Sequence, residues 1–269
     1  MKPLEKDSVL FEGIVSVSAL IKAADSGTAR RKIIRVLIEE SKFSKERHKV
    51  GFIRTASQRL GFVIEKITQS DVAELSSGKT HGGFFAEATS AVYPGLDDVI
   101  PEKLSFAVIL DGTEDPYSLG HSARVLYSCG CDALIVPRLP DMADSVIVKA
   151  SAGSFELLPV YLSDSAEAAA LFKKAGIKIA CAGIRDSVSL KDADLKYPLL
   201  LVCGGEKRGI SSSVAGGSDG KNSLQQRGYG FSSLRNGSFD FCLRNHEQEQ
   251  LTHIYNRSYY LNHEEIKTI

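Results

Sequence analysis

The sequence predicts an α/β protein whose C-terminal half contains a parallel sheet. Residues 106–110 and residues 199–203 are continuous apolar runs bounded by turn residues, a pattern that is typical of strands buried on both faces of a parallel sheet. Helical segments separate these runs from further strand-like segments, so we expect βαβ units. In open sheets of this class, functional residues lie in the loops that follow the carboxyl ends of the strands.

The chain is long enough for two domains. It has 269 residues, of which 43% are hydrophobic, and one domain usually takes about 100–200 residues. Residues 94–101 are rich in Gly, Asp and Pro, which favours a connection between domains. We therefore predict a small α/β domain at residues 1–97, a linker at 98–103 and a second α/β domain at 104–269.

Composition disfavours several classes of protein. No segment approaches the roughly 18 unbroken apolar residues of a membrane span, and the N-terminus lacks the apolar core of a secretory signal. We therefore expect a cytoplasmic protein with no membrane segment. The cysteines are odd in number and mostly lie in apolar, strand-like contexts, which favours buried thiols over disulfides or a metal site. We expect no bound metal.

The net charge does not indicate nucleic-acid binding, because Lys plus Arg (33) equals Asp plus Glu (33). The distribution of charge along the chain is less even. Between residues 29 and 66, basic residues outnumber acidic ones, and the run begins with Arg30 and Arg31. This excess could supply a phosphate-contacting face, or it could be a solvated helix surface. Charge alone leaves both interpretations open.

Periodicity predicts alternating elements in the first domain, with helices at 13–24, 45–60 and 71–75 and strands at 32–38, 62–67 and 84–89. Gly78-Lys79-Thr80 lies in the loop before the last strand, but the first Gly of a phosphate loop is missing and no helix follows, so we reject that motif. Lys79 and His81 are candidates for RNA contact. The alternative for His81 is a loop residue satisfied by backbone hydrogen bonds.

The second domain continues the alternation. After the strand at 106–110 we expect a helix that carries Arg124, helices at 144–150 and 163–175, and strands at 133–136, 157–162, 177–182 and 199–203. The last strand ends in Gly204-Gly205, a turn whose bare backbone N–H groups suit the polar edge of a cofactor. Neither glycine cluster matches the dinucleotide or phosphate-loop pattern, which disfavours a nicotinamide oxidoreductase and a nucleotidase.

Two motifs of this domain resemble those of the SpoU/TrmH RNA 2'-O-ribose methyltransferases of the SPOUT class. The first motif is Asp111-x3-Asp115-Pro116-x2-Leu119-Gly120-x3-Arg124, and the second runs from Leu200 through Gly204-Gly205-Glu206 to Gly209-Ile210. About 75 residues separate them, and this intervening segment is predicted to alternate between strands and helices. The first domain is similar to the small ribosomal-protein-like RNA-binding domain of many members, so the resemblance covers roughly residues 9–214.

The resemblance implies a C-terminal SPOUT domain with a trefoil knot, S-adenosylmethionine as cofactor, a homodimer, and methyl transfer to a ribose 2'-OH of rRNA or tRNA. It implies catalytic roles for Arg124, Ser118 and Glu206. The implied cofactor contacts are Val202, Cys203, Gly204, Gly205, Gly209 and Ile210, and the expected RNA contacts are Arg30, Arg31, Lys79 and His81. The alternative for Arg124 is a helix arginine that pairs with Glu114 or Asp115.

The chain departs from the family pattern at three places. Ser118 replaces the usual Asn, which keeps a hydroxyl but loses the amide's paired donor and acceptor, and His121 replaces a small or apolar residue. After residue 214 the family's third motif, Ser-Leu-x-x-(Ser/Ala)-x-Ala opening an apolar helix, is missing from its expected place. The segment there is rich in Gly, Ser and Arg and has no apolar period. Such composition predicts disorder or poor packing.

A frameshift near residues 214–217 would explain this departure. Residues 233–245 can be back-translated so that the frame one base later encodes Ala-Leu-Glu-Thr-Ala-Ala-Ser-Thr-Phe-Ala-Phe-Glu, which resembles the missing motif and its helix. We therefore expect the third motif to be lost or frameshifted. The alternative function is a catalytically impaired RNA-binding protein of the same ancestry, and binding of S-adenosylmethionine distinguishes the two.

Overall fold

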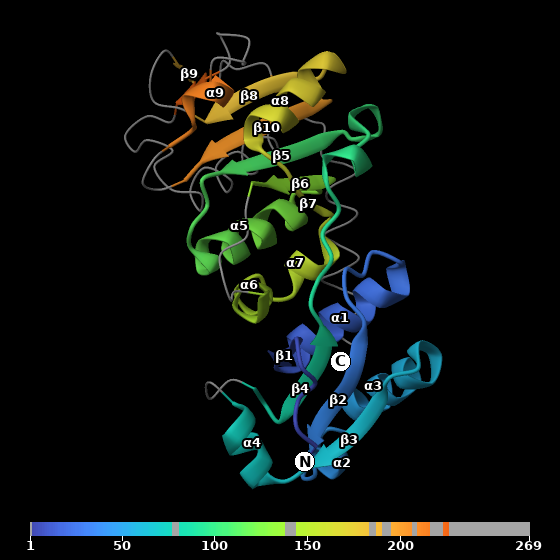
Figure 1. The fold of residues 1–269 in the computed structure, drawn as a ribbon. Helices are drawn as coiled ribbons and strands as arrows, with labels where there is room; N and C mark the ends of the chain where they lie inside the picture. Colours follow the sequence, from blue (N-terminus) through green and yellow to red (C-terminus); the bar gives the residue numbers. More distant parts are fainter. Residues whose placement is uncertain are drawn as a thin grey trace.

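The computed structural model describes residues 2–76, 81–137, 144–182, 195–205 and 209–214, together with the backbone of 187–189, 215 and 223–225. Figure 1 shows two α/β domains, with the N-terminal domain (blue to teal) at the bottom and the C-terminal domain (green to orange) at the top. Within the described residues, no helix is long and apolar enough to cross a membrane.

The N-terminal domain is a mixed four-stranded sheet with helices on both faces. Its elements are β1 (Ser8–Glu12), α1 (Ile14–Ser26), β2 (Ile33–Glu39), α2 (Lys42–Lys45), α3 (Arg47–Leu60), β3 (Val63–Ile67), α4 (Gln69–Leu75) and β4 (Phe84–Thr89). The strand order is β1-β4-β2-β3, in which β4 is antiparallel to both neighbours and β2 is parallel to β3. Gly27 and Gly61 end α1 and α3 in the left-handed conformation, which glycine adopts at no steric cost.

The C-terminal domain is built on a seven-stranded sheet. Two short 3-10 turns, Leu96–Asp98 and Pro101–Lys103, precede it. Its elements are β5 (Phe106–Asp111), α5 (Pro116–Ser128), β6 (Ala133–Val136), α6 (Asp144–Ala150), α7 (Ser154–Leu157), β7 (Val160–Leu162), α8 (Ser165–Lys174), β8 (Lys178–Ala182), β9 (Ser187–Ser189), β10 (Leu199–Gly204), α9 (Ser212–Ala215) and β11 (Ser223–Gln225). The strand order is β7-β6-β5-β10-β8-β11-β9, and all these neighbours are parallel.

The predicted fold class, an α/β chain with a small first domain and a parallel sheet in the second, is confirmed. Several segments differ from the prediction, which includes no strand at β1 or β9 and no helix at α2 or α9. Two further differences have a plain cause. Leu157 ends helix α7 rather than beginning a strand, because Gly153 adopts a left-handed φ of 85° and opens that helix. Strand β11 lies between β8 and β9, although no ordered element is predicted after residue 214. Backbone pairing with β8 supplies hydrogen bonds without requiring an apolar side-chain pattern.

Side chains of the central strands alternate between two buried clusters. On β5, Phe106, Val108 and Leu110 belong to the cluster that includes α5 and the N-terminal domain, whereas Ala107 and Ile109 belong to the cluster that includes α8. Residues two apart along a strand point to the same face of a sheet. The continuous apolar runs seen in the sequence therefore correspond to strands covered on both faces.

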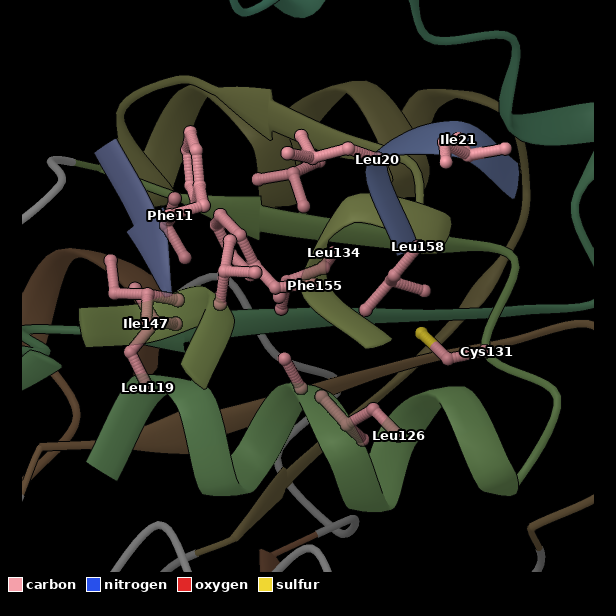
Figure 2. Packing of buried hydrophobic residues seen from close by; sticks show 14 of the residues in the cluster. Phe11, Leu20, Ile21, Leu119, Leu126, Cys131, Leu134, Ile147, Phe155 and Leu158 are labelled. Atoms are coloured by element: carbon pink, nitrogen blue, oxygen red, sulfur yellow. The ribbon is translucent and has the colours of Figure 1, made fainter. Parts of the chain in front are cut away.

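One hydrophobic cluster continues from the N-terminal domain into the C-terminal domain. It joins Phe11 of β1 to Leu119 of α5 and Phe155 of α7 (Figure 2). Helices α1 and α7 approach each other so closely that a Cβ on Gly153 would lie 2.5 Å from the Cβ of Ala19. The two domains therefore share a core rather than meeting only at a linker.

Arg30 reaches from the N-terminal domain into the C-terminal domain beside this cluster. Its guanidinium donates hydrogen bonds to the backbone carbonyls of Leu158, at 2.7 Å, and of Phe155. The same group lies over the rings of Tyr93 and Phe155, at 5.2 and 4.9 Å from their centroids. These carbonyls lie at the end of α7, so the arginine satisfies acceptors that a helix leaves without partners.

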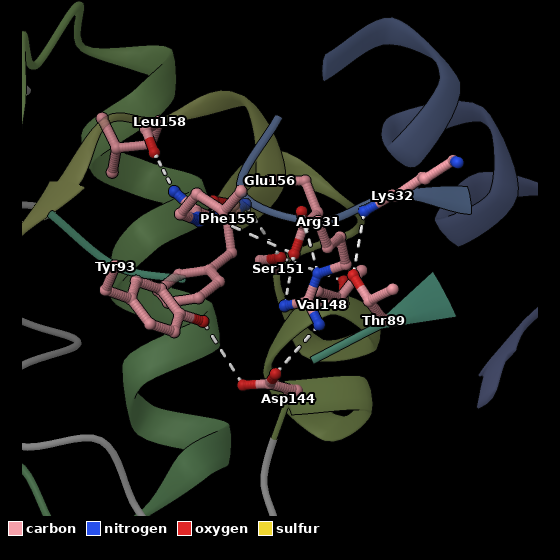
Figure 3. A network of polar contacts seen from close by, with 11 residues as sticks. Arg31, Lys32, Thr89, Tyr93, Asp144, Val148, Ser151, Phe155, Glu156 and Leu158 are labelled. Atoms are coloured by element: carbon pink, nitrogen blue, oxygen red, sulfur yellow. Dashed lines mark hydrogen bonds and ion pairs between the residues drawn. The ribbon is translucent and has the colours of Figure 1, made fainter. Parts of the chain in front are cut away.

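Arg31 also forms buried ion pairs across the interface (Figure 3). Its guanidinium lies 3.1 Å from Glu156 and 2.9 Å from Asp144, and the side chains of Arg31 and Glu156 are almost fully buried. Burial raises the pKa of Tyr93, so its hydroxyl stays protonated and donates to Asp144 at 3.3 Å.

The two arginines therefore lie elsewhere than the sequence predicts. Arg30 and Arg31 are only 9% and 7% exposed, and their guanidinium groups contact protein rather than a surface that RNA could reach. Buried charges persist in proteins when partners satisfy them, and here the partners come from the other domain. We assign both residues to the attachment of the N-terminal domain to the C-terminal domain.

Glu156→Gln tests this attachment, because it keeps the shape of the side chain but removes the charge that faces both arginines. A buried pair that loses one partner leaves an uncompensated charge, so we expect the free energy of unfolding to fall by roughly 3–5 kcal/mol. Urea denaturation followed by circular dichroism measures the change.

Lys149→Ala is the matched control. Its pair with Glu12 also joins the two domains, at 3.1 Å, but the Lys149 side chain is 43% exposed. Removing an exposed pair usually costs under about 1 kcal/mol. Equal losses of stability in Glu156→Gln and Lys149→Ala would contradict the importance of the buried network.

Candidate active site

The two motif-bearing loops meet at one edge of the C-terminal sheet. Strands β5 and β10 are parallel neighbours, and their last residues, Asp111 and Gly204, are paired; Figure 1 shows both arrows pointing to the left of the view. After β5 the chain builds β6 and β7 on one side and then crosses to β8 and β10 on the other. The carboxyl ends of β5 and β10 therefore form a topological switch point, where open α/β sheets bind ligands.

Helix α5 begins directly after the β5 loop, and local sequence fixes its first turn. The Asp115 carboxylate accepts a hydrogen bond from the backbone N–H of Ser118 at 2.7 Å, which satisfies one of the free donors of the helix N-terminus. Pro116 occupies the first position of the helix, where its fixed φ is favourable. The Asp-Pro pair of the first motif thus starts α5 directly after the β5 loop.

The exposed face of α5 carries Tyr117, His121 and Arg124. Tyr117 is 56% exposed, and a ring nitrogen of His121 lies 2.7 Å from the Tyr117 carbonyl oxygen. Ser118 points the other way and is only 4% exposed. The structure therefore groups Arg124 with an aromatic residue and a histidine, and does not bring it to the predicted catalytic residue Ser118.

Arg124 is available for a ligand. In the part of the chain that the structure describes, its side chain is exposed and forms no ion pair and no hydrogen bond. The alternative assignment, an arginine paired with Glu114 or Asp115, is therefore not observed. Arg124 lies on the helix that begins at this edge of the sheet, and an exposed guanidinium can bind a phosphate or a hydroxyl oxygen.

Two of the predicted cofactor contacts lie inside the sheet. Val202 and Cys203 are paired with β5 on one side and with β8 on the other, and both side chains are buried. Their backbone groups therefore belong to the two ladders. The ladder with β8 ends at Cys203, so Gly204 and Gly205 are the first residues of this segment that can offer backbone to a ligand on that side.

Gly205 and Gly209 close a tight turn at the end of β10. The N–H of Gly209 donates to the carbonyl of Gly205 at 3.0 Å. A Cβ on Gly205 would lie 2.3 Å from the carbonyl oxygen of Gly112, and a Cβ on Gly204 would lie 2.2 Å from the backbone of Gly209. Glycine is needed here because three stretches of backbone approach one another closely.

The other predicted residues are less informative. Glu206 and Lys79 lie outside the described residues. In His81, Nδ1 accepts a hydrogen bond from the backbone N–H of Gly83 at 3.0 Å, and the ring stacks on Phe85 with centroids 5.3 Å apart. These contacts favour the interpretation of His81 as a satisfied loop residue, and its contact with RNA stays a prediction.

Asp111, the last residue of β5, belongs to the first motif, but the motif alone gives it no separate role. The structure places its carboxylate at the sheet edge, 8% exposed, with both oxygens accepting hydrogen bonds. An acid at the end of an otherwise apolar strand is the sequence signal that could have found it. Among the described residues there is no group of three or more side chains arranged to bind a metal.

Comparison with known sequences identifies this domain. Residues 105–234 match the SpoU rRNA Methylase family. This part of the chain belongs to that family. The SpoU domain contains both motif loops, and its matched range ends beyond the last strand that the structure describes.

Related proteins and structures agree with this assignment. A TrmH family protein of Staphylococcus saprophyticus is 29% identical over 159 residues, and the chain covers 64% of that protein's length. The 23S rRNA (guanosine-2'-O-)-methyltransferase RlmB of Shewanella oneidensis is 26% identical over 213 residues, which are 77% of this chain and 83% of that protein. The crystal structure of an AdoMet-bound rRNA methyltransferase from Sinorhizobium meliloti has the same fold, with a TM-score of 0.72 at 18% identity over 90% of this chain and 88% of that one.

Gly205→Ala tests the close approach between the two motif loops. The added Cβ would collide with the Gly112 backbone, which cannot move as a flexible side chain can. We expect thermal and urea denaturation to show a loss of about 1–3 kcal/mol, the usual cost of forcing extra atoms into a packed site.

Gly51→Ala is the matched control for this substitution. Gly51 lies in α3, and nothing lies within 4 Å of a Cβ built on it. Alanine is favoured over glycine in a helix by up to about 1 kcal/mol, so the control should keep or raise stability. A Gly205→Ala variant as stable as the parent would contradict the observed packing.

Proposed function

We propose that this chain is an S-adenosylmethionine-dependent RNA methyltransferase that modifies a ribose 2'-OH of rRNA or tRNA. The observation that carries the proposal is the meeting of two SpoU-family motif loops at the carboxyl ends of β5 and β10. The name of the Shewanella relative specifies 2'-O methylation of guanosine in 23S rRNA, and the Sinorhizobium structure contains AdoMet. Both support the proposal.

The glycine turn after β10 is the proposed cofactor site. Gly204 and Gly205 lie beyond the end of the β8 ladder, so on that side their backbone groups are not paired with β8. Gly209 is exposed and Ile210 is half-buried. Main-chain N–H and C=O groups at a sheet edge suit the adenine and amino-acid ends of S-adenosylmethionine. The cofactor would supply an electrophilic methyl group on a sulfonium. Val202 and Cys203 would support this site from inside the sheet.

Arg124 is the proposed group that places the ribose. Methyl transfer needs the 2'-OH to lie in line with the methyl group and to lose its proton as it attacks. A guanidinium scarcely deprotonates, so Arg124 does not act as the base, and water would accept the proton of the 2'-OH. It donates hydrogen bonds to the hydroxyl oxygen or a neighbouring phosphate and stabilises the negative charge that develops on the oxygen. Glu206 stays a predicted catalytic residue, and Ser118 contributes through the first turn of α5.

The N-terminal domain supplies the proposed second RNA contact. Arg54 of α3 and Lys66 of β3 are exposed and lie over the ring of Phe43, at 5.7 and 5.0 Å from its centroid. Two cations beside an aromatic ring can bind phosphates and stacked bases. In this proposal they replace Arg30 and Arg31 as phosphate contacts. A homodimer, a trefoil knot and a cytoplasmic location stay predictions from the sequence.

Arg124→Ala is expected to lower the rate of methyl transfer at least about 100-fold, as loss of a transition-state donor does, while leaving the affinity for S-adenosylmethionine unchanged. The assay follows labelled methyl from S-adenosylmethionine into unmodified rRNA and tRNA, and mass spectrometry identifies the methylated nucleoside. Lys103→Ala, which removes an exposed cation from the connection between the domains, is the control and should retain full activity.

Two results would contradict the proposal. A methyl group found on a base rather than on a ribose would exclude the 2'-O reaction. RNA binding by a wild-type protein that neither binds S-adenosylmethionine nor transfers methyl groups would favour the alternative, a catalytically impaired RNA-binding protein of the same ancestry.

The third motif also stays a prediction, because residues 233–245 lie outside the described part of the chain. We expect the coding DNA, read one base later through these codons, to encode the apolar helix that the family pattern requires. Sequencing of the gene decides this directly. A second frame that encodes no such helix would end the frameshift hypothesis.

A further inference from the structure

Asp111 is a buried carboxylate in a strand that is otherwise apolar. It is the last residue of β5 and is 8% exposed, while the five residues before it are fully buried apolar side chains. Burial of an ionised carboxylate is costly unless hydrogen bonds compensate it. Its partners therefore indicate what the residue does at this position.

Both oxygens of the Asp111 carboxylate accept hydrogen bonds from distant parts of the chain. Oδ1 accepts from the hydroxyl of Ser165, the first residue of α8, at 2.8 Å. Oδ2 accepts from the backbone N–H of Ser211, just before α9, at 2.7 Å. Bonds from neutral donors to a carboxylate are among the stronger hydrogen bonds in proteins. One side chain thus holds β5, α8 and the segment after β10 together.

The bond to Ser211 anchors the far end of the glycine turn. Its near end is held by the sheet, because Gly204 pairs with Asp111 itself, and by the contact between Gly205 and the Gly112 backbone. The segment between these anchors contains Gly209, whose N–H bonds back to Gly205. The two described ends of the turn are therefore held by Asp111, the last residue of β5, and by Gly112 of the loop that follows it.

We infer that Asp111 is a positioning residue that holds the described residues of the glycine turn, 204–205 and 209–211, in the conformation that receives the cofactor. The inference rests on the proposed function for the identity of that cofactor. Asp111 does not touch the reacting atoms, and it acts through the Ser211 backbone. Without the carboxylate, the turn keeps its near anchor but loses its far one.

The test compares three substitutions that alter these bonds in different ways. Asp111→Ala removes both bonds. Asp111→Asn keeps both, because its carbonyl oxygen can accept from the Ser211 N–H while its amide donates to the Ser165 hydroxyl. Ser165→Ala removes only the bond to α8.

Asp132→Ala is the matched control. Its carboxylate accepts hydrogen bonds from the backbone N–H groups of Ser105 and Phe106, at 2.8 and 3.0 Å, where β5 begins. It therefore removes a similar carboxylate from the opposite end of the same strand. Loss of stability alone should be similar in Asp111→Ala and Asp132→Ala.

Two measurements are made on each full-length variant. Hydrogen exchange monitored by mass spectrometry reports protection of residues 209–214, and calorimetry reports the affinity for S-adenosylmethionine. We expect Asp111→Ala to exchange faster at 209–214 and to bind the cofactor about 10- to 100-fold more weakly, the loss typical of a hydrogen bond to a charged group. Asp111→Asn, Ser165→Ala and Asp132→Ala should stay within about threefold of the wild-type affinity.

The outcomes separate the inference from the function on which it rests. Faster exchange in Asp111→Ala with no binding by any protein, wild type included, would support the anchoring of the turn and overturn the cofactor assignment. Unchanged exchange at 209–214 in Asp111→Ala, or a loss of affinity in Asp132→Ala as large as in Asp111→Ala, would overturn the positioning role.

Discussion

The parallel pairing of β5 with β10 is the constraint on which the candidate site depends. Adjacent parallel strands end at the same edge of a sheet, so the register that pairs Asp111 with Gly204 brings together two motifs that are far apart in sequence. The pairing is stable because both strands are apolar on both faces and α5 and α8 cover those faces. Glycines then let the two loops touch through backbone alone. The meeting of the two loops is therefore a consequence of the sheet pairing.

A second constraint acts between the domains. The hydrophobic core that includes β1 and α1 continues into α5 and α7. Beside it, Arg30 and Arg31 form buried hydrogen bonds and ion pairs with the C-terminal domain. A domain tethered only by a linker could take many orientations. A shared core with buried charges favours one orientation, so a nucleic acid that contacts the N-terminal domain would meet the SpoU domain at a fixed geometry.

The parts that the sequence predicts well are those governed by local pattern. Continuous apolar runs predicted β5 and β10, and Asp-Pro and Gly-Gly predicted the loops that follow them.

The incorrect predictions concern residues whose partners are distant in the sequence. Arg30 and Arg31 look like surface charges because Glu156 and Asp144, which neutralise them, lie more than a hundred residues away. The role of Asp111 likewise depends on Ser211, which only the fold brings near. Strand β11 pairs through backbone and leaves no apolar period to detect.

Calorimetric titration of the purified 269-residue chain with S-adenosylmethionine tests the central claim most directly. We expect saturable binding in the micromolar range with one cofactor per chain, since Gly209 is hydrogen-bonded to Gly205 and Ser211 to Asp111 before any cofactor binds. Circular dichroism of the same sample establishes that the protein is folded. A folded protein that gives only heats of dilution would contradict the claim that this sheet edge is a cofactor site.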